Sequence, residues 1–97
     1  MAKTPEAKVR DPVVKWAKDQ GILHFRMSFR IGVKRGVPDD LFVLPGGRHV
    51  WIEFKAPDKE PTALQMKRLR DLQVQGAAAF WTGSTALAID YLQLKMR

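Results

Sequence analysis

Two apolar segments joined by a glycine turn carry charged side chains where a buried strand would normally exclude them. "DLFVL" (residues 40–44) and "RHVWIEFKA" (48–56) are predicted to be neighbouring strands, because β-branched and aromatic residues dominate them and a Pro-Gly-Gly turn separates them. Asp39 precedes the first segment, and Glu53 and Lys55 lie inside the second. Moving an unpaired ion out of water costs several kcal/mol of free energy. These three charged side chains must therefore interact with one another or with a ligand, or reach solvent.

The rest of the chain alternates helical and extended patterns around this hairpin. We predict helices over residues 5–20, 62–75 and 84–96, and strands over 22–29, 40–44, 48–56 and 77–82. The order α-β-β-β-α-β-α predicts an α/β fold in which helices flank a mixed β-sheet, as one domain over residues 1–97. Pro12 leaves two interpretations of the first helix, which either kinks there or gives way to a second helix beginning at Asp11.

The balance of charge favours a polyanionic partner. Seventeen lysines and arginines against ten acidic residues give a formal net charge of +7, which favours nucleic acid over an acidic membrane surface. The absence of cysteine excludes disulfides and thiolate metal sites. The polar N-terminus does not resemble a signal peptide, and no apolar run approaches the ~20 residues that span a bilayer, so we expect a soluble, cytoplasmic protein.

The three charged residues of the hairpin are expected to meet at one place. Alternation puts Glu53 and Lys55 on the same face of their strand, and the short turn brings Asp39 level with them. Two adjacent carboxylates repel each other unless one is protonated or a cation binds both. Mg²⁺ accepts one or two carboxylates and completes its shell with water and phosphate oxygens, which is the chemistry of phosphodiester hydrolysis. The alternative is a structural ion-pair network on a half-exposed face.

The helix after this hairpin offers one further polar side chain. Gln65 is spaced i, i+4, i+7 with Leu69 and Leu72, so it shares their buried face and is directed towards the sheet. A glutamine there could hydrogen-bond water or phosphate at the site. The equally open alternative is a glutamine at the rim of the hydrophobic core.

Several of these stretches together resemble one nuclease family. Pro38-Asp39 followed 14 positions later by Glu53-x-Lys55 has the form of the PD-(D/E)xK nucleases. The longer strings "GVPD", "WIEFKAP" and "PTALQ" resemble the VRR-Nuc (virus-type replication-repair nuclease) family, and "TPEAKV" is similar to the start of its phage-type stand-alone members. The resemblance extends from about Thr4 to Tyr91 and implies a restriction-endonuclease-like core.

The resemblance assigns roles to individual residues. They are the metal-binding carboxylates Asp39 and Glu53, the backbone carbonyl of Phe54 as a further metal ligand, the catalytic Lys55, Gln65 on the following helix, and Glu6, which reaches the metal through water. Asp40 is expected to face away from Asp39 by strand alternation and to be structural. Gly36 is expected to permit a close backbone approach before the site.

The basic residues upstream of the site are candidates for DNA contacts. They are Arg26, Arg30, Lys34 and Arg35, and the alternative for them is a solvated basic loop. His24, by contrast, is expected to be an ordinary strand residue without an acidic neighbour.

The resemblance implies a Mg²⁺- or Mn²⁺-dependent, structure-specific endodeoxyribonuclease that acts as a homodimer on four-way (Holliday) junctions in phage DNA replication or repair. The alternatives are a flap or nicking nuclease of the same chemistry, a non-catalytic DNA-binding module, and a structural subunit of a phage assembly. For a phage protein, the expected location is the cytoplasm of the bacterial host.

Overall fold

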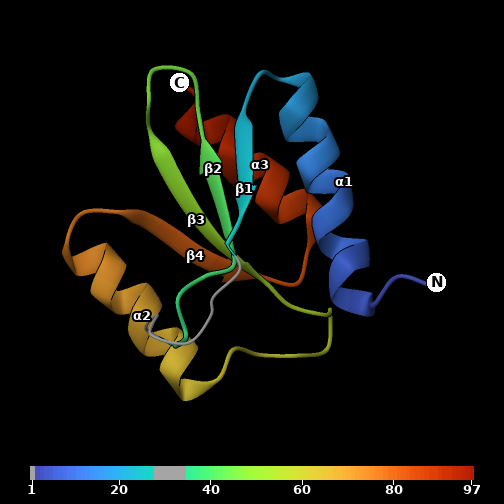
Figure 1. Ribbon diagram of the computed structural model, residues 1–97, viewed down its shortest axis with the longest axis vertical. Helices are drawn as coiled ribbons and strands as arrows, with labels where there is room; N and C mark the ends of the chain where they lie inside the picture. The colour runs from blue at the N-terminus through green and yellow to red at the C-terminus, as the bar shows by residue number, and fades with distance from the viewer. Residues whose placement is uncertain (1, 28–34) are drawn as a thin grey trace.

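The computed structural model of the chain describes residues 2–27 and 35–97, and its elements follow the predicted order (Figure 1). They are α1 (Pro5–Asp19), β1 (Leu23–Arg26), β2 (Asp40–Val43), β3 (His49–Phe54), α2 (Ala63–Val74), β4 (Ala78–Thr82) and α3 (Thr85–Lys95). The prediction of an α/β fold with a mixed sheet flanked by helices is therefore confirmed. The first strand was predicted to continue to residue 29, and its last two predicted positions lie outside the described residues.

The four strands form one sheet in the order β1-β2-β3-β4. β1, β2 and β3 are antiparallel neighbours, whereas β3 and β4 are parallel and are connected through α2. A parallel pair requires such a crossover, since a tight turn cannot return the chain to the start of the next strand. The carboxyl ends of β3 and β4 consequently lie at the same edge of the sheet, and Glu53 is located at that edge.

Helix α1 is a single helix that passes through Pro12. Thr4 caps it by accepting a hydrogen bond from the backbone N–H of Ala7 at 3.1 Å. The interpretation that a second helix begins at Asp11 is wrong. Val9 and Val13, one turn apart on either side of Pro12, are both buried, and this packing holds the helix together despite the missing backbone donor.

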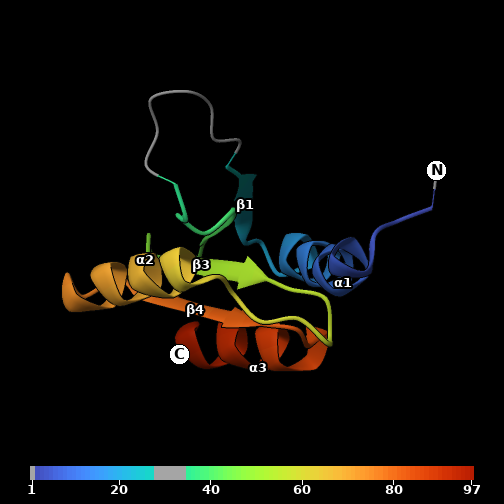
Figure 2. The same ribbon diagram turned by 90° about the horizontal axis from the view of Figure 1, so that it is seen from below.

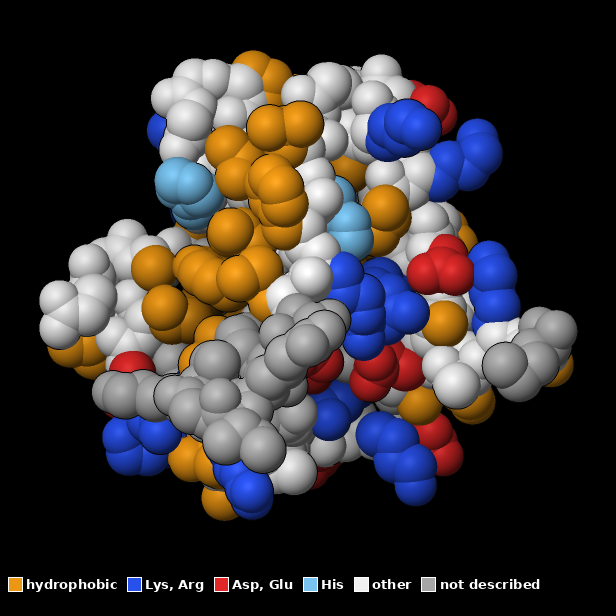
Figure 3. Space-filling view, viewed as in Figure 1, with side chains coloured by type: hydrophobic (Ala, Val, Ile, Leu, Met, Phe, Trp, Pro, Cys, Tyr) orange, Lys and Arg blue, Asp and Glu red, His pale blue; other side chains and the backbone are white. Residues whose placement is uncertain are grey.

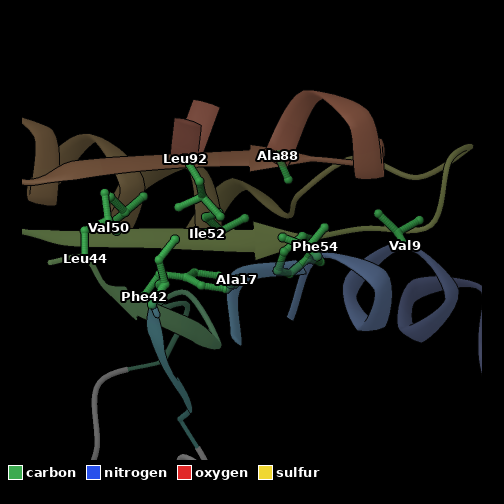
Figure 4. Packing of buried hydrophobic residues seen from close by; sticks show 11 residues of the cluster. Val9, Ala17, Phe42, Leu44, Val50, Ile52, Phe54, Ala88 and Leu92 are labelled. Carbon is green, nitrogen blue, oxygen red and sulfur yellow. The ribbon is translucent and has the colours of Figure 1, made fainter. Parts of the chain in front are cut away.

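The hydrophobic core lies between the sheet and the pair of helices α1 and α3. Figure 4 shows side chains from the central strand β3 meeting residues of both helices. Along β3 the buried hydrophobic residues alternate, at Val50, Ile52 and Phe54. The buried cluster consists of Val9, Val13, Ala17, Ile22, Phe42, Leu44, Val50, Ile52, Phe54, Ala88 and Leu92.

The opposite face of the sheet carries the charged residues of the hairpin. Glu53 and Trp51 point to this face, because they alternate with the core residues of β3. Helix α2 packs on it over β4, on the side of the sheet opposite α3, as Figure 2 shows. Over β1–β3 the same face presents a band of hydrophobic side chains to solvent, and Leu23 and Phe25 are the most exposed of them (Figure 3). Within the described ranges, no helix has the length and hydrophobicity to cross a membrane.

Candidate active site

Asp39 and Glu53 are brought together by the register of β2 and β3. Asp40 pairs with Ile52, so one residue further along the antiparallel pair Asp39 comes opposite Glu53, as predicted from the hairpin. The backbone carbonyl of Asp39 accepts a hydrogen bond from the N–H of Met27 at 2.6 Å, which extends the pairing with β1 beyond the strand end. The two carboxylates thus occupy fixed backbone positions at the edge of the sheet.

Glu53 is a buried acid in an environment that opposes its ionisation. Only 2% of its surface is exposed. Burial and, to a smaller extent, the negative charge of Asp39 raise the pKa of Glu53 from 4.5 to about 8, whereas Lys55 opposes this rise. The charge of Glu6 also raises the pKa of Glu53, so the α1 carboxylate lies within electrostatic reach of the site. The protonated form of Glu53 is therefore favoured at neutral pH, and an approaching positive charge would favour ionisation.

Asp39 experiences a similar but weaker conflict. Burial raises its pKa above the usual value, the Arg26 guanidinium lowers it, and Asp40 raises it again. Lys55, immediately after β3, also lowers the pKa of Asp39. The amine of Lys55 consequently acts on both carboxylates, which is the convergence that the sequence predicted.

Arg26 lies among three carboxylates at the end of β1. Its Nη1 donates to Asp40 Oδ2 at 3.1 Å, and its Nη2 lies 4.0 Å from both Asp39 Oδ2 and Glu6 Oε2. Glu6 also accepts a hydrogen bond from Arg10 at 3.2 Å. The first turn of α1 is therefore connected to the site through Arg26, so Pro12 does not displace Glu6 from it.

Asp40 faces the core side of the sheet, as strand alternation predicted, and it is almost fully buried, with 1% of its surface exposed. His24 lies beside it and donates its Nε2–H to Asp40 Oδ1 at 2.7 Å. The expectation that His24 has no acidic neighbour was wrong, because His24 and Arg26 alternate on the same face of β1 as Asp40 on β2. Asp40 thus binds two cationic or donor side chains and is satisfied inside the protein.

Gln65 is part of the cap of α2. Its side-chain Oε1 accepts a hydrogen bond from the Thr62 backbone N–H at 2.8 Å. The backbone N–H of Gln65 donates to Thr62 Oγ1 at 3.2 Å, and the two bonds form a capping box. The carbonyl oxygen of the Gln65 side chain is therefore engaged in holding the start of the helix. A role for Gln65 at the reacting phosphate stays a prediction, and it would fall to the amide nitrogen.

The segment before Asp39 is braced against α2. Gly36 has φ = +81°, and a Cβ at this position would lie 2.9 Å from Leu64 Cγ and 3.0 Å from its carbonyl oxygen. Arg68 donates to the carbonyl of Arg35 at 3.0 Å. The close backbone approach expected at Gly36 is made to α2, and it fixes the direction from which the chain enters the site.

The remaining predicted residues fall into two groups. The side chain of Phe54 fills the core, with 1% exposed, so that only its backbone carbonyl could contact a cation. Arg35 is exposed, whereas the DNA contacts predicted at Arg30 and Lys34 lie outside the described residues. Figure 3 shows acidic and basic side chains intermixed on this face, next to the hydrophobic band.

Two solved structures share the fold of this chain. One, described as a VRR_NUC domain, superposes with a TM-score of 0.83 at 25% identity, covering 94% of this chain and 97% of its own length. A second, described as a VRR_NUC domain protein, superposes with a TM-score of 0.68 at 23% identity and covers 97% of this chain and 89% of its own. The fold of the chain and the similarity of its sequence to these structures support a resemblance to the VRR-Nuc family. No family model matches the sequence.

One curated phage protein is similar to part of this chain. The "Putative nuclease p44" of Acyrthosiphon pisum secondary endosymbiont phage 1 is 47% identical over 34 residues. The match covers 35% of this chain and 37% of the length of that relative. Together with the VRR-Nuc structures, it supports a nuclease-type domain here.

The donor set formed by Asp39 and Glu53 can be compared with the ligands that a divalent cation requires. Glu53 Oε1 is buried and has no hydrogen-bond partner in the described part of the chain. An unsatisfied buried carboxylate oxygen costs about 1–3 kcal/mol or more, and a cation would satisfy it. Across residues 2–27 and 35–97, no three acidic or histidine side chains converge into a closed metal cage. The pair Asp39 and Glu53 could hold an ion such as Mg²⁺ only with water and phosphate oxygens completing its shell, since this ion needs one or two carboxylates.

One functional arrangement was missed by reasoning from the sequence. From the sequence, His24 was expected to be an ordinary strand residue, Arg26 a candidate DNA contact and Asp40 a structural residue. The spacing His24-x-Arg26 places both side chains on one face of a strand. Knowing that the neighbouring antiparallel strand carries the buried Asp40 on that face would have identified their partner. The missing information was the register between β1 and β2, because the loop between them is too long to set it.

Proposed function

We propose that this chain is a divalent-metal-dependent endonuclease that hydrolyses DNA phosphodiesters at the edge of the sheet formed by Asp39, Glu53 and Lys55. The observation that carries this proposal is the buried Glu53. In the pairing of β2 and β3 this residue lies opposite Asp39, and its Oε1 has no hydrogen-bond partner among the described residues. A folded protein retains such an unfavourable carboxylate at a functional site, where strained or desolvated groups are concentrated. The nuclease-type domain of its relatives supports the same chemistry.

The side chains have distinct roles in this proposal. Asp39, Glu53 and the backbone carbonyl of Phe54 would hold Mg²⁺ or Mn²⁺. Bound there, the ion would polarise the scissile phosphoryl group and lower the pKa of a coordinated water. Lys55 stabilises the negative charge that develops on the phosphate and orients the nucleophile. Glu6 contributes negative charge at the edge of the site.

We further propose a branched DNA substrate and a homodimer. The net charge of +7 favours DNA binding through phosphates, with Arg30, Lys34 and Arg35 as candidate contacts. A 97-residue chain has little surface for reading bases, so structure is a more economical recognition signal than sequence. A two-fold dimer matches the pseudo-symmetry of a four-way junction and places one active site on each of two strands. For a phage-encoded protein, this substrate would be in the cytoplasm of the bacterial host.

The direct test is cleavage of labelled DNA of defined structure. A four-way junction, a 5′ flap and a linear duplex are each incubated with the protein in Mg²⁺, Mn²⁺ or EDTA. Glu53→Gln and Lys55→Ala are expected to lower cleavage by at least about 100-fold while DNA binding is retained. Glu60→Gln, which changes an exposed carboxylate outside the site, is the matched control and should cleave as the wild type does.

Each pattern of cleavage has a different meaning. Paired, symmetric nicks in the junction that require metal, Glu53 and Lys55 would support a homodimeric junction resolvase. Cleavage of the flap alone would retain the chemistry and replace the substrate by that of a flap or nicking nuclease. Tight DNA binding with no cleavage in either metal would refute the nuclease proposal and leave a non-catalytic DNA-binding module.

A further inference from the structure

The carboxylates Glu6, Asp39 and Asp40, here called the acidic centre, surround the guanidinium of Arg26. Arg26 donates to Asp40 at 3.1 Å, and its other terminal nitrogen lies 4.0 Å from both Asp39 and Glu6. One guanidinium therefore spans three carboxylates that come from α1, the entry to β2 and β2 itself. This position differs from that of an arginine directed outward to grip a phosphate.

Buried Asp40 fixes this guanidinium in place. With 1% of its surface exposed, Asp40 directs one oxygen to Arg26 and the other to His24, and both bonds are within 3.1 Å. An arginine held by one strong charge-assisted bond has its second nitrogen aimed by the planar fork of the guanidinium. The direction of that fork is towards Asp39 and Glu6. Asp40 and His24 thus act on the site through Arg26, although neither belongs to the pair of candidate metal ligands.

We propose that Arg26 is an internal counter-ion of the acidic centre, which shares Asp39 with the divalent cation and thereby lowers the affinity of the site for it. This inference rests on the proposed metal-dependent function. A positive charge at this distance from Asp39 repels an incoming dication. It also neutralises part of the negative charge of Asp39 that would attract the dication. It also stabilises the folded chain before the cation binds. Arg26 is a positioning and charge-balancing residue, not a ligand.

The side chain of Arg26 can adjust when a cation arrives. It is 43% exposed, so the guanidinium can withdraw from Asp39 and Glu6 while remaining attached to Asp40. The 4.0 Å separations to Asp39 and Glu6 are loose contacts that cost little to break, whereas the 3.1 Å bond to Asp40 is the anchor. The competition is therefore confined to the shared carboxylate.

The experiment is a titration of Mn²⁺ into the metal-free protein at fixed pH and salt, measured by isothermal calorimetry. Arg26→Gln removes the charge, and Arg26→Lys keeps it. Lys15→Gln is the control, because it removes the same unit of charge from an exposed position remote from the site on α1. We expect Arg26→Gln to bind Mn²⁺ about tenfold more tightly than the wild type, Arg26→Lys within about threefold, and Lys15→Gln within about twofold.

The outcomes separate this inference from the proposed function. If the wild type binds Mn²⁺, Glu53→Gln weakens that binding, and Arg26→Gln leaves it unchanged or weaker, the counter-ion inference is overturned while the metal site stands. If the wild type does not bind Mn²⁺, both are overturned. If Arg26→Gln is unfolded in EDTA, refolding on addition of Mn²⁺ supports the inference, because one cation then replaces the other. If it stays unfolded with Mn²⁺, Arg26 has only a structural role.

Discussion

Glu53→Gln should make the metal-free protein more stable, and by an amount that depends on pH. The substitution keeps the shape of the side chain and removes the ability to ionise. In the wild type, the unfolded chain releases the Glu53 proton above its ordinary pKa of 4.5, whereas the folded chain keeps it up to about 8. The free energy of unfolding of the wild type therefore falls as the pH rises from 4.5 to about 8, and stays low above that range.

The size of the effect follows from the same shift. A pKa raised from 4.5 to about 8, at ~1.36 kcal/mol per pH unit, corresponds to about 5 kcal/mol at most. Entry of water and rearrangement of Lys55 around the ionised acid reduce this, so we expect about 2–4 kcal/mol at pH 9. Domains of this size have a total stability of about 5–15 kcal/mol, so the loss would be readily measured.

The assay is urea unfolding in EDTA, followed by circular dichroism at pH values between 4.5 and 9. The informative quantity is the difference in unfolding free energy between Glu53→Gln and the wild type at each pH, because the fixed effect of burying an amide cancels. This difference should grow with pH, and Glu60→Gln should show no such trend. Saturating Mg²⁺ or Mn²⁺ should selectively restore the wild type at high pH. A difference that is constant with pH, or that shrinks as pH rises, would refute the burial of Glu53 as the cause.

Four further substitutions test the surroundings of the site. Gly36→Ala should destabilise the protein by about 1–3 kcal/mol in thermal or urea unfolding, because φ is +81° and the new methyl group meets Leu64. Phe42→Ala should cost about 3–5 kcal/mol in the same assay, since this side chain is fully buried, and a loss below 1 kcal/mol would contradict the described core. Thr62→Ala should cost about 1 kcal/mol and leave cleavage intact, whereas Gln65→Ala should also lower cleavage only if its amide contacts the substrate.

The architecture could be predicted from the sequence because its signals are local. Alternation along residues 48–56, the glycine turn before it and the helical pattern over residues 62–75 each depend on neighbours within a few positions. The pairing of Asp39 with Glu53 was predictable for the same reason, since a short hairpin turn determines its own register. These features needed no knowledge of distant contacts.

Most of the features that the sequence did not predict depend on contacts between segments that no short turn connects. The capping bond of Gln65 is the local exception. Arg26 was predicted to be a DNA contact at the end of the first strand, and only the pairing of β1 with β2 places it opposite Asp40. Gln65 was assigned to the site from helical spacing, but a capping bond to its own helix competes for the same amide. Helix α1 continues through Pro12 because tertiary burial of its neighbours outweighs one lost hydrogen bond.

Alternating residues of strand β3 face the hydrophobic core and the candidate active site. Ile52 and Phe54 face the core, and Glu53 between them faces the site, so the same backbone that is held by hydrophobic packing presents a carboxylate that destabilises the metal-free fold. Asp40 is the exception, since it is charged and lies on the core side. Its partner Arg26 extends from that side around the end of the sheet to Asp39. The electrostatic connection between the two faces therefore passes through one arginine, and a change in its charge should affect folding stability and metal affinity in opposite directions.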